Sequence, residues 1–174
     1  MQTSITRDGN WTMLLVAALV VDVVVIILSR HTGVFGNALN VWYDRFGLSA
    51  VIADVLSIAI GIWLARWVYN TWFAGRGLAW FLGILVIIQV IHDILFYVGV
   101  ILPIPRGLNA MMDVFKDYGV ENGWKIIVGD AGLFMASIGV FMAMERLSAP
   151  WQVGVGILTL YAIPYALTTR AIKV

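Results

Sequence analysis

Five long apolar stretches, each close to twenty residues, dominate the pattern of hydrophobic and polar positions along this chain. A helix needs about 20 apolar residues to cross the roughly 30 Å hydrocarbon core of a bilayer. The pattern therefore predicts an all-α integral membrane protein with five transmembrane helices. The expected spans are 11–29, 48–73, 78–101, 126–144 and 151–167.

Composition strengthens this interpretation. The chain of 174 residues is 61% hydrophobic and only 12% charged, whereas soluble domains carry about a quarter of charged residues. We therefore expect one transmembrane domain over residues 1–174, a multi-pass location and the lipid bilayer as partner. The first stretch is too long for a cleaved signal peptide and ends in Ser29-Arg30 without a small-residue cleavage pattern, so it should remain as a helix.

Each of the first four apolar stretches contains one aspartate: Asp22, Asp54, Asp93 and Asp130. Carboxylates are costly in hydrocarbon, so they usually face the interior of a helix bundle and mark a functional site. Counted from the helix ends at 1.5 Å per residue, all four lie on the order of 8–12 Å from the same membrane face. The pattern predicts a shared or adjoining polar site, and the alternative is four separate polar contacts.

Two segments between these stretches repeat one amphipathic pattern. In 36–47, Leu39, Trp42, Tyr43 and Phe46 follow the spacing i, i+3, i+4 and i+7, which makes one apolar stripe on a short helix. Such helices are expected to lie in the membrane interface, with the apolar side toward the hydrocarbon. The second segment, 107–119, has the same spacing at Leu108, Met111, Met112 and Phe115.

The repeated pattern extends into the spans. Asp22 precedes Gly36 by 14 residues, and Asp93 precedes Gly107 by the same number. This spacing predicts a tandem repeat of span, interfacial helix and span, covering 11–73 and 78–144, with the fifth span at 151–167. Repeats of equal topology are related by an axis along the membrane normal, as in some transporters. The alternative is two hairpins with unrelated amphipathic connections.

The third apolar stretch has the densest polar face. Gln89, His92, Asp93 and Tyr97 lie at i, i+3, i+4 and i+8, so they project to one side of a helix. His92 is a candidate proton carrier or metal ligand, and the alternative is a hydrogen-bonded core histidine. Hard cations take oxygen ligands, so His92, Asp93 and Asp130 are the candidate metal ligands. The full predicted ion- or proton-binding set is Asp22, Asp54, Gln89, His92, Asp93, Tyr97 and Asp130.

Charge and cysteine content limit the remaining classes. Seven of the eleven Lys and Arg residues fall on the side of the predicted interfacial helices, which the positive-inside rule makes cytoplasmic. This places the N-terminus outside and the C-terminus in the cytoplasm. The absence of cysteine excludes disulfides and thiolate sites. The net charge of +1 argues neither for nor against nucleic acid, and we expect neither a nucleic-acid partner nor a cofactor.

One further set of motifs is spread over roughly residues 50–140: Ile60-Gly61, Ala65-Arg66, Gln89, His92-Asp93, Phe96-Tyr97, Pro105-Arg106-Gly107, Asn109, Asp113, Phe115-Lys116, Tyr118 and Gly129-Asp130. Together these motifs resemble a family of small multi-pass proteins encoded by large DNA viruses that infect algae and protists. The resemblance implies a viral or host membrane, but the family has no assigned activity.

Three functions remain open at this point. The first is a proton or small-cation channel or transporter, for which intramembrane acids are typical; a pore from so small a bundle would require a homo-oligomer. The second is a structural or assembly protein of a viral or host membrane, in which the polar groups fix helix register. The third is a membrane-embedded, metal-assisted lipid-modifying enzyme. No catalytic spacing supports it, so an enzyme is the less favoured class.

Overall fold

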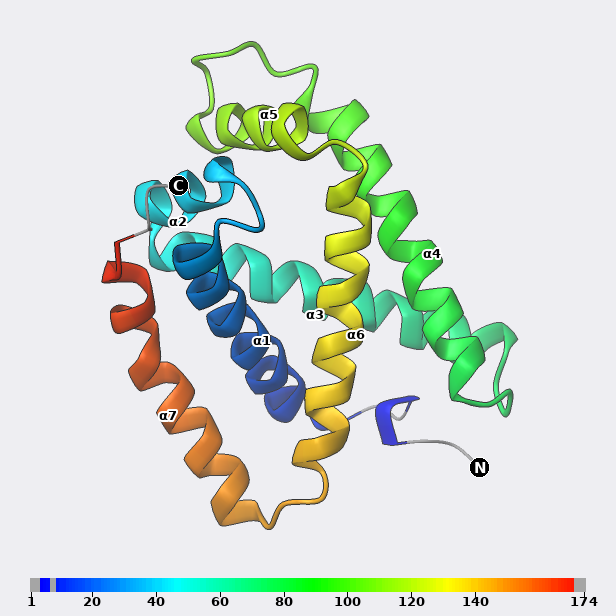
Figure 1. The fold of residues 1–174 in the computed structure, drawn as a ribbon. Helices are drawn as coiled ribbons and strands as arrows, with labels where there is room; N and C mark the ends of the chain where they lie inside the picture. The colour runs from blue at the N-terminus through cyan, green and yellow to red at the C-terminus, as the bar shows by residue number, and fades with distance from the viewer. Residues whose placement is uncertain (1–3, 7–8, 171–174) are drawn as a thin grey trace.

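The computed structural model describes residues 4–6 and 9–170, so Arg7 and Lys173, which entered the orientation argument, lie outside the described residues. The described part contains seven α-helices, a short 3-10 helix η1 (Ser4–Thr6) and a π-helical segment η2 (Tyr97–Ile101), and it has no strand (Figure 1). The α-helices are α1 (Trp11–Thr32), α2 (Asn37–Phe46), α3 (Leu48–Trp72), α4 (Leu78–Phe96), α5 (Ala110–Asn122), α6 (Lys125–Met144) and α7 (Ala149–Thr168).

Five of these elements are long and apolar enough to cross a membrane: α1, α3, α4 continued by η2, α6 and α7. The predicted all-α fold with five spans is therefore confirmed, and the span ends differ from the prediction by a few residues. The largest difference is at α1, which continues to Thr32. It ends there because Gly33 adopts φ 64° and its N–H bonds the carbonyl of Ser29.

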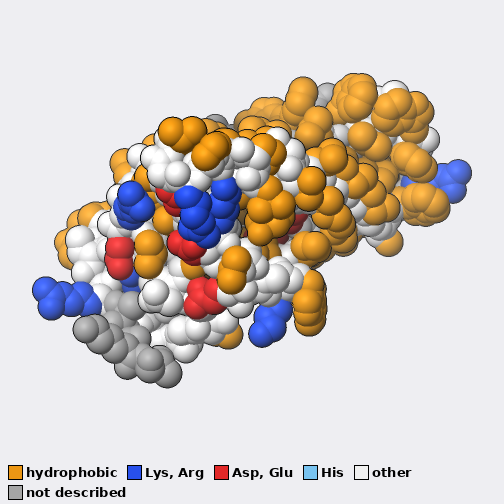
Figure 2. Space-filling view, turned by 90° about the horizontal axis from the view of Figure 1, so that it is seen from above, with side chains coloured by type: hydrophobic (Ala, Val, Ile, Leu, Met, Phe, Trp, Pro, Cys, Tyr) orange, Lys and Arg blue, Asp and Glu red, His pale blue; other side chains and the backbone are white. Residues whose placement is uncertain are grey.

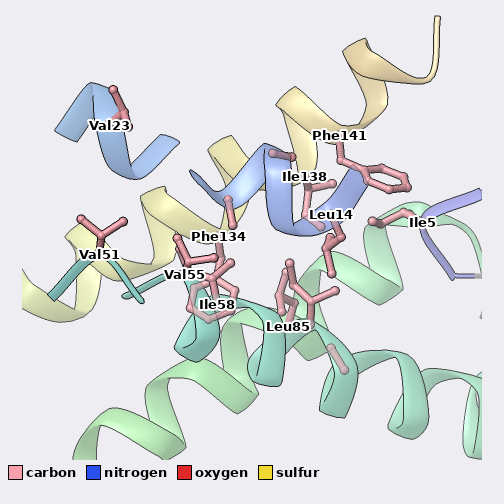
Figure 3. Close-up of a cluster of buried hydrophobic side chains, with 14 of the residues drawn as sticks. Ile5, Leu14, Val23, Val51, Val55, Ile58, Leu85, Phe134, Ile138 and Phe141 are labelled. Atoms are coloured by element: carbon pink, nitrogen blue, oxygen red, sulfur yellow. The ribbon is translucent and has the colours of Figure 1, made fainter. Parts of the chain in front are cut away.

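Four spans form the body of the bundle. Helix α1 packs on α6 and α3, α4 packs on the same two helices, and α7 lies outside against α1 (Figure 1). Aliphatic and aromatic side chains from these helices fill the centre, among them Leu14, Ile58, Leu85, Ile138 and Phe141 (Figure 3). Helices α2 and α5 pack on each other across one end of the bundle. Figure 2 looks down on this end and shows charged side chains gathered there among hydrophobic ones.

The first predicted amphipathic helix forms within 36–47, and its stripe faces the bundle. Trp42 and Tyr43 are buried, and Leu39 and Phe46 are half-buried. In the second segment the prediction was wrong at one position: Leu108 is 76% exposed and lies before α5. The helix begins later because the side chain of Asn109 accepts hydrogen bonds from the N–H groups of Met111 and Met112, which makes Asn109 the N-cap.

The packing relates the two predicted repeats in a consistent way. The pair α1–α6 has its counterpart in α4–α3, the pair α1–α3 has its counterpart in α4–α6, and α2 meets α5. A twofold relation between α1–α2–α3 and α4–α5–α6 would produce these pairings. The duplication itself stays a prediction, as does the orientation of the termini.

A carboxylate joins the two helices at the end of the bundle. Both oxygens of Glu121 in α5 accept hydrogen bonds, each of 2.7 Å, from the N–H groups of Asn37 and Ala38 at the start of α2. Negative charge is favourable at a helix N-terminus. Gly36 leaves the room for this contact, since a Cβ there would lie 2.6 Å from the carboxyl carbon of Glu121.

We expect Glu121→Gln to lower the free energy of unfolding by about 1 kcal/mol, because the charge and one acceptor at the start of α2 are lost. Glu121→Ala removes both acceptors and should cost more. Unfolding by SDS in mixed micelles, followed by circular dichroism, measures both variants. Equal stability of Gln, Ala and wild type would contradict a capping role.

Candidate functional site: an acid-lined cavity

A cavity of about 730 Å³ lies among α3, α4 and α6, beneath α2 and α5. Side chains from all four aspartate-bearing spans reach it, so the four acids adjoin one space. Asp22 and Gln89 are almost fully buried, whereas Asp54, Asp93 and Asp130 are partly accessible. Whether these groups bind an ion or a proton stays a prediction. The cavity lining includes every residue of the predicted set, namely Asp22, Asp54, Gln89, His92, Asp93, Tyr97 and Asp130.

The first acid pair consists of Asp22 on α1 and Asp54 on α3, and α2 bridges it. The hydroxyl of Tyr43 donates to Oδ1 of Asp22 over 2.9 Å, and the indole N–H of Trp42 donates to Oδ2 of Asp54 over 3.0 Å. Tyr43 also lies near enough to Asp54 for the charge of Asp54 to act on it. Two residues of the apolar stripe of α2, Tyr43 and Trp42, thus donate hydrogen bonds to Asp22 and Asp54.

Tyr43 is a neutral hydroxyl in this position. Burial raises the pKa of Tyr43 well above its ordinary value, and the charges of Asp54 and Asp22 raise it further. A phenol carries one proton, so it donates to only one carboxyl at a time. The hydroxyl donates to Asp22 and lies near enough to Asp54 for the charge of Asp54 to act on it.

The second acid pair joins two other spans. Asp93 on α4 and Asp130 on α6 adjoin each other, and both Asp93 and Asp54 are near enough for their charges to act on Asp130. On α4 the amide of Gln89 donates to Oδ2 of Asp93, and Nδ1 of His92 lies 3.2 Å from Oδ1.

A second tyrosine lies next to the acids from the side of α5. Burial raises the pKa of Tyr118, and the charges of Asp130, Asp54 and Glu121 add to this effect. Tyr118 is therefore a neutral hydroxyl in the lining of the cavity. Tyr97, in the π-helical segment, packs against α5: a Cβ on Gly119 would lie 2.7 Å from the ring of Tyr97. Single-turn π-helical segments of this kind are frequent at functional sites.

Two buried acceptors in the cavity lining have no hydrogen-bond partner. They are Oδ2 of Asp22, a residue that is 4% exposed, and Oε1 of Gln89, which is 2% exposed. A buried acceptor without a partner costs about 1–3 kcal/mol. Neither atom has accessible surface, so both are enclosed by protein and do not face the open space of the cavity.

His92 occupies a less enclosed position than the rest of its predicted face. Its side chain is 55% exposed and stacks on Phe96, whereas Gln89, on the same helix, is buried. Within residues 4–6 and 9–170, no group of three His, Asp or Glu side chains is close enough to hold a metal ion. The geometry thus gives His92, Asp93 and Asp130 no support as a metal centre.

The cavity occupies only one half of the bundle. Its lining extends no further than Leu64 along α3 and Phe134 along α6. Beyond these residues the buried side chains of Leu85, Ile138 and Phe141 fill the interior (Figure 3). The described helices therefore enclose a half-depth cavity and not a continuous polar passage.

The cavity is open on its side. Exposed residues of α3 (Leu56, Ile60), of α4 (Ile94) and of η2 (Val98) belong to its lining, so the opening lies between α3 and the span formed by α4 and η2. Helices α3 and α4 meet at the end joined by their connection and diverge toward α2 and α5 (Figure 1). Ile60 is near the middle of the α3 span, which places the opening at the level of the hydrocarbon.

Sequence reasoning missed three residues of this site. Tyr43 and Trp42 had been assigned to an apolar stripe, and Tyr118 had no role in the site. Each is an aromatic side chain with a polar group at its tip, a type that normally finds a hydrogen-bond partner when buried. Their place on a helix that connects two acid-bearing spans was the available signal.

Comparison with known proteins identified no relative of this chain: no family model, no curated protein and no solved structure matches it.

Proposed function

We propose that this membrane protein binds protons, or small cations in their place, at the acid-lined cavity and carries them between the two sides of the membrane. One observation carries the proposal: four aspartates from four spans line one cavity, and the described lining contains no Lys or Arg to neutralise them. Acid chains inside spans are typical of proton pathways.

The half-depth cavity favours a carrier over an open channel. A channel in a single chain would need a polar route past Phe134 and Phe141, which are buried among apolar neighbours. In a carrier, the helices around a fixed site rearrange and expose it to each side in turn. A homo-oligomeric pore is the alternative form of the same proposal. The setting in a viral or host membrane, with the N-terminus outside, belongs to the proposal as well.

Proton flux in liposomes tests this function. The purified protein is reconstituted with a pH-sensitive dye inside, and a pH gradient is imposed with a potassium gradient and valinomycin to clamp the voltage. We expect wild-type flux above protein-free liposomes. Asp93→Asn should lower the flux by at least about a hundredfold, because the amide cannot share an exchangeable proton with Asp130.

The matched control is Asp117→Asn. Asp117 is an exposed aspartate on α5 that pairs with Arg106 and is outside the cavity lining. This variant should retain the wild-type flux, and circular dichroism should show that both variants are folded. Absence of flux in the wild type under proton and cation gradients, with Asp93→Asn only less stable, would overturn the proposal in favour of a structural network.

A further inference from the structure

The cavity offers a ligand hydrogen-bond acceptors and negative charge. Its polar wall contains four aspartates and, among the lining residues that the structure describes, no Lys or Arg. Three of these aspartates, Asp54, Asp93 and Asp130, are partly accessible. A ligand that complements these groups must donate hydrogen bonds, and a cationic head does so with the correct charge.

The remainder of the cavity is apolar and large. Its volume of about 730 Å³ exceeds the space that a single dehydrated cation fills and lies in the range of pockets for drug-sized ligands. Aliphatic and aromatic side chains form most of its surface, among them Leu64, Met111, Leu133 and Phe134. A ligand that fills the cavity therefore has an apolar part as well as a donor head.

The side opening determines where such a ligand enters. It lies between Ile60 on α3 and Ile94 on α4, at the level of the hydrocarbon. An amphiphile dissolved in the bilayer reaches this opening without crossing water. A zwitterionic phospholipid is a poor fit, because no basic side chain of the described lining would neutralise its phosphate.

We propose that the cavity binds an amphiphile with a single alkyl chain and a cationic amine head, which enters sideways from the bilayer between α3 and α4. The ammonium group lies among the partly accessible carboxyl groups of Asp54, Asp93 and Asp130 and donates to them, while the chain lies along the apolar wall toward the opening. This inference names a ligand class for the cavity of the proposed function and rests on its role as a cation site.

The inference is tested by measuring the binding of radiolabelled dodecylamine to the protein in phosphatidylcholine nanodiscs. Empty nanodiscs measure the amine that dissolves in the lipid alone, and this amount is subtracted. We expect saturable binding that unlabelled dodecylamine displaces and that dodecanol, dodecanoate and ethylamine do not. Asp93→Asn should weaken binding by at least about tenfold, because truncating one partner of a buried charge pair is costly. Binding that dodecanol displaces as well as the amine would overturn the inference.

A second variant tests the route of entry independently of the acids. Ile60→Trp places a large ring at the opening and should weaken or slow binding. Its control, Ile52→Trp, makes the same change at an exposed position of α3 outside the lining. Equal binding of both tryptophan variants would overturn entry between α3 and α4. Proton flux without saturable amine binding would overturn this inference and leave the proposed function in place. Saturable amine binding without proton flux would support the ligand class and overturn the proposed transport.

Discussion

Asp44→Asn is expected to lower the free energy of unfolding by about 3 kcal/mol, although the Asp44 side chain is 62% exposed. The reason is its partner. Oδ1 of Asp44 lies 2.7 Å from the guanidinium of Arg30, whose side chain is fully buried at the end of α1. Loss of the carboxylate leaves a buried cation without its counter-charge. Unfolding by SDS in mixed micelles measures the change.

Arg30 also holds three helices together. Its guanidinium donates to Asn40 on α2 and to the carbonyl of Leu167 on α7, each over 3.4 Å. Ser29 and Asn40 add a reciprocal pair of hydrogen bonds between α1 and α2. These neutral acceptors remain in Asp44→Asn, so the variant isolates the effect of the charge.

The matched control is Asp117→Asn. The pair Arg106–Asp117 has nearly the same length, 2.8 Å, but its side chains are 55% and 60% exposed. Exposed pairs contribute up to about 1 kcal/mol and are screened by salt. We expect the loss in Asp117→Asn to be small and to vanish at high salt, while the loss in Asp44→Asn persists. Equal losses in the two variants would show that water or lipid solvates Arg30.

The spans and the common level of the aspartates could be predicted because both are properties of single helices. Length and apolarity define a span, and a fixed rise of 1.5 Å per residue defines the depth of Asp22 or Asp130. The pairing of the acids depends on which helices are neighbours. Nothing in the sequence pattern placed α6 beside both α1 and α4, and this packing decides that Asp130 meets Asp93.

The errors of prediction have local causes. Helical spacing placed Leu108 in the second apolar stripe, but the cap at Asn109 starts the helix after it. For α2, an apolar stripe can face lipid or protein equally well, so spacing alone did not show that Tyr43 and Trp42 cover the acids. The half-depth of the cavity depends on how far Phe134 and its neighbours fill the bundle. That is a property of packing among several helices and is not visible in any one of them.

Tyr43→Phe is expected to lower proton flux by about a hundredfold while the protein stays folded. The Tyr43 hydroxyl connects the carboxyls of Asp22 and Asp54, and the charge of Asp54 acts in turn on Asp130. A neutral hydroxyl passes a proton by accepting one and donating its own. Because the pKa of Tyr43 is raised well above 10, the group keeps this form throughout the neutral range. Phenylalanine preserves the ring and removes the link.

The liposome assay gives the initial rate, and Tyr161→Phe is the matched control. Tyr161 also has its hydroxyl in contact with a neighbour, Tyr165 at 2.8 Å, but it is exposed on α7 and outside the cavity lining. Dodecylamine binding separates a relay from a structural role: a relay predicts that Tyr43→Phe loses flux and binds the amine within a few-fold of wild type, since Asp93, Asp130 and Gln89 are unchanged. Wild-type flux in Tyr43→Phe would show that the proton path does not pass through the Tyr43 hydroxyl.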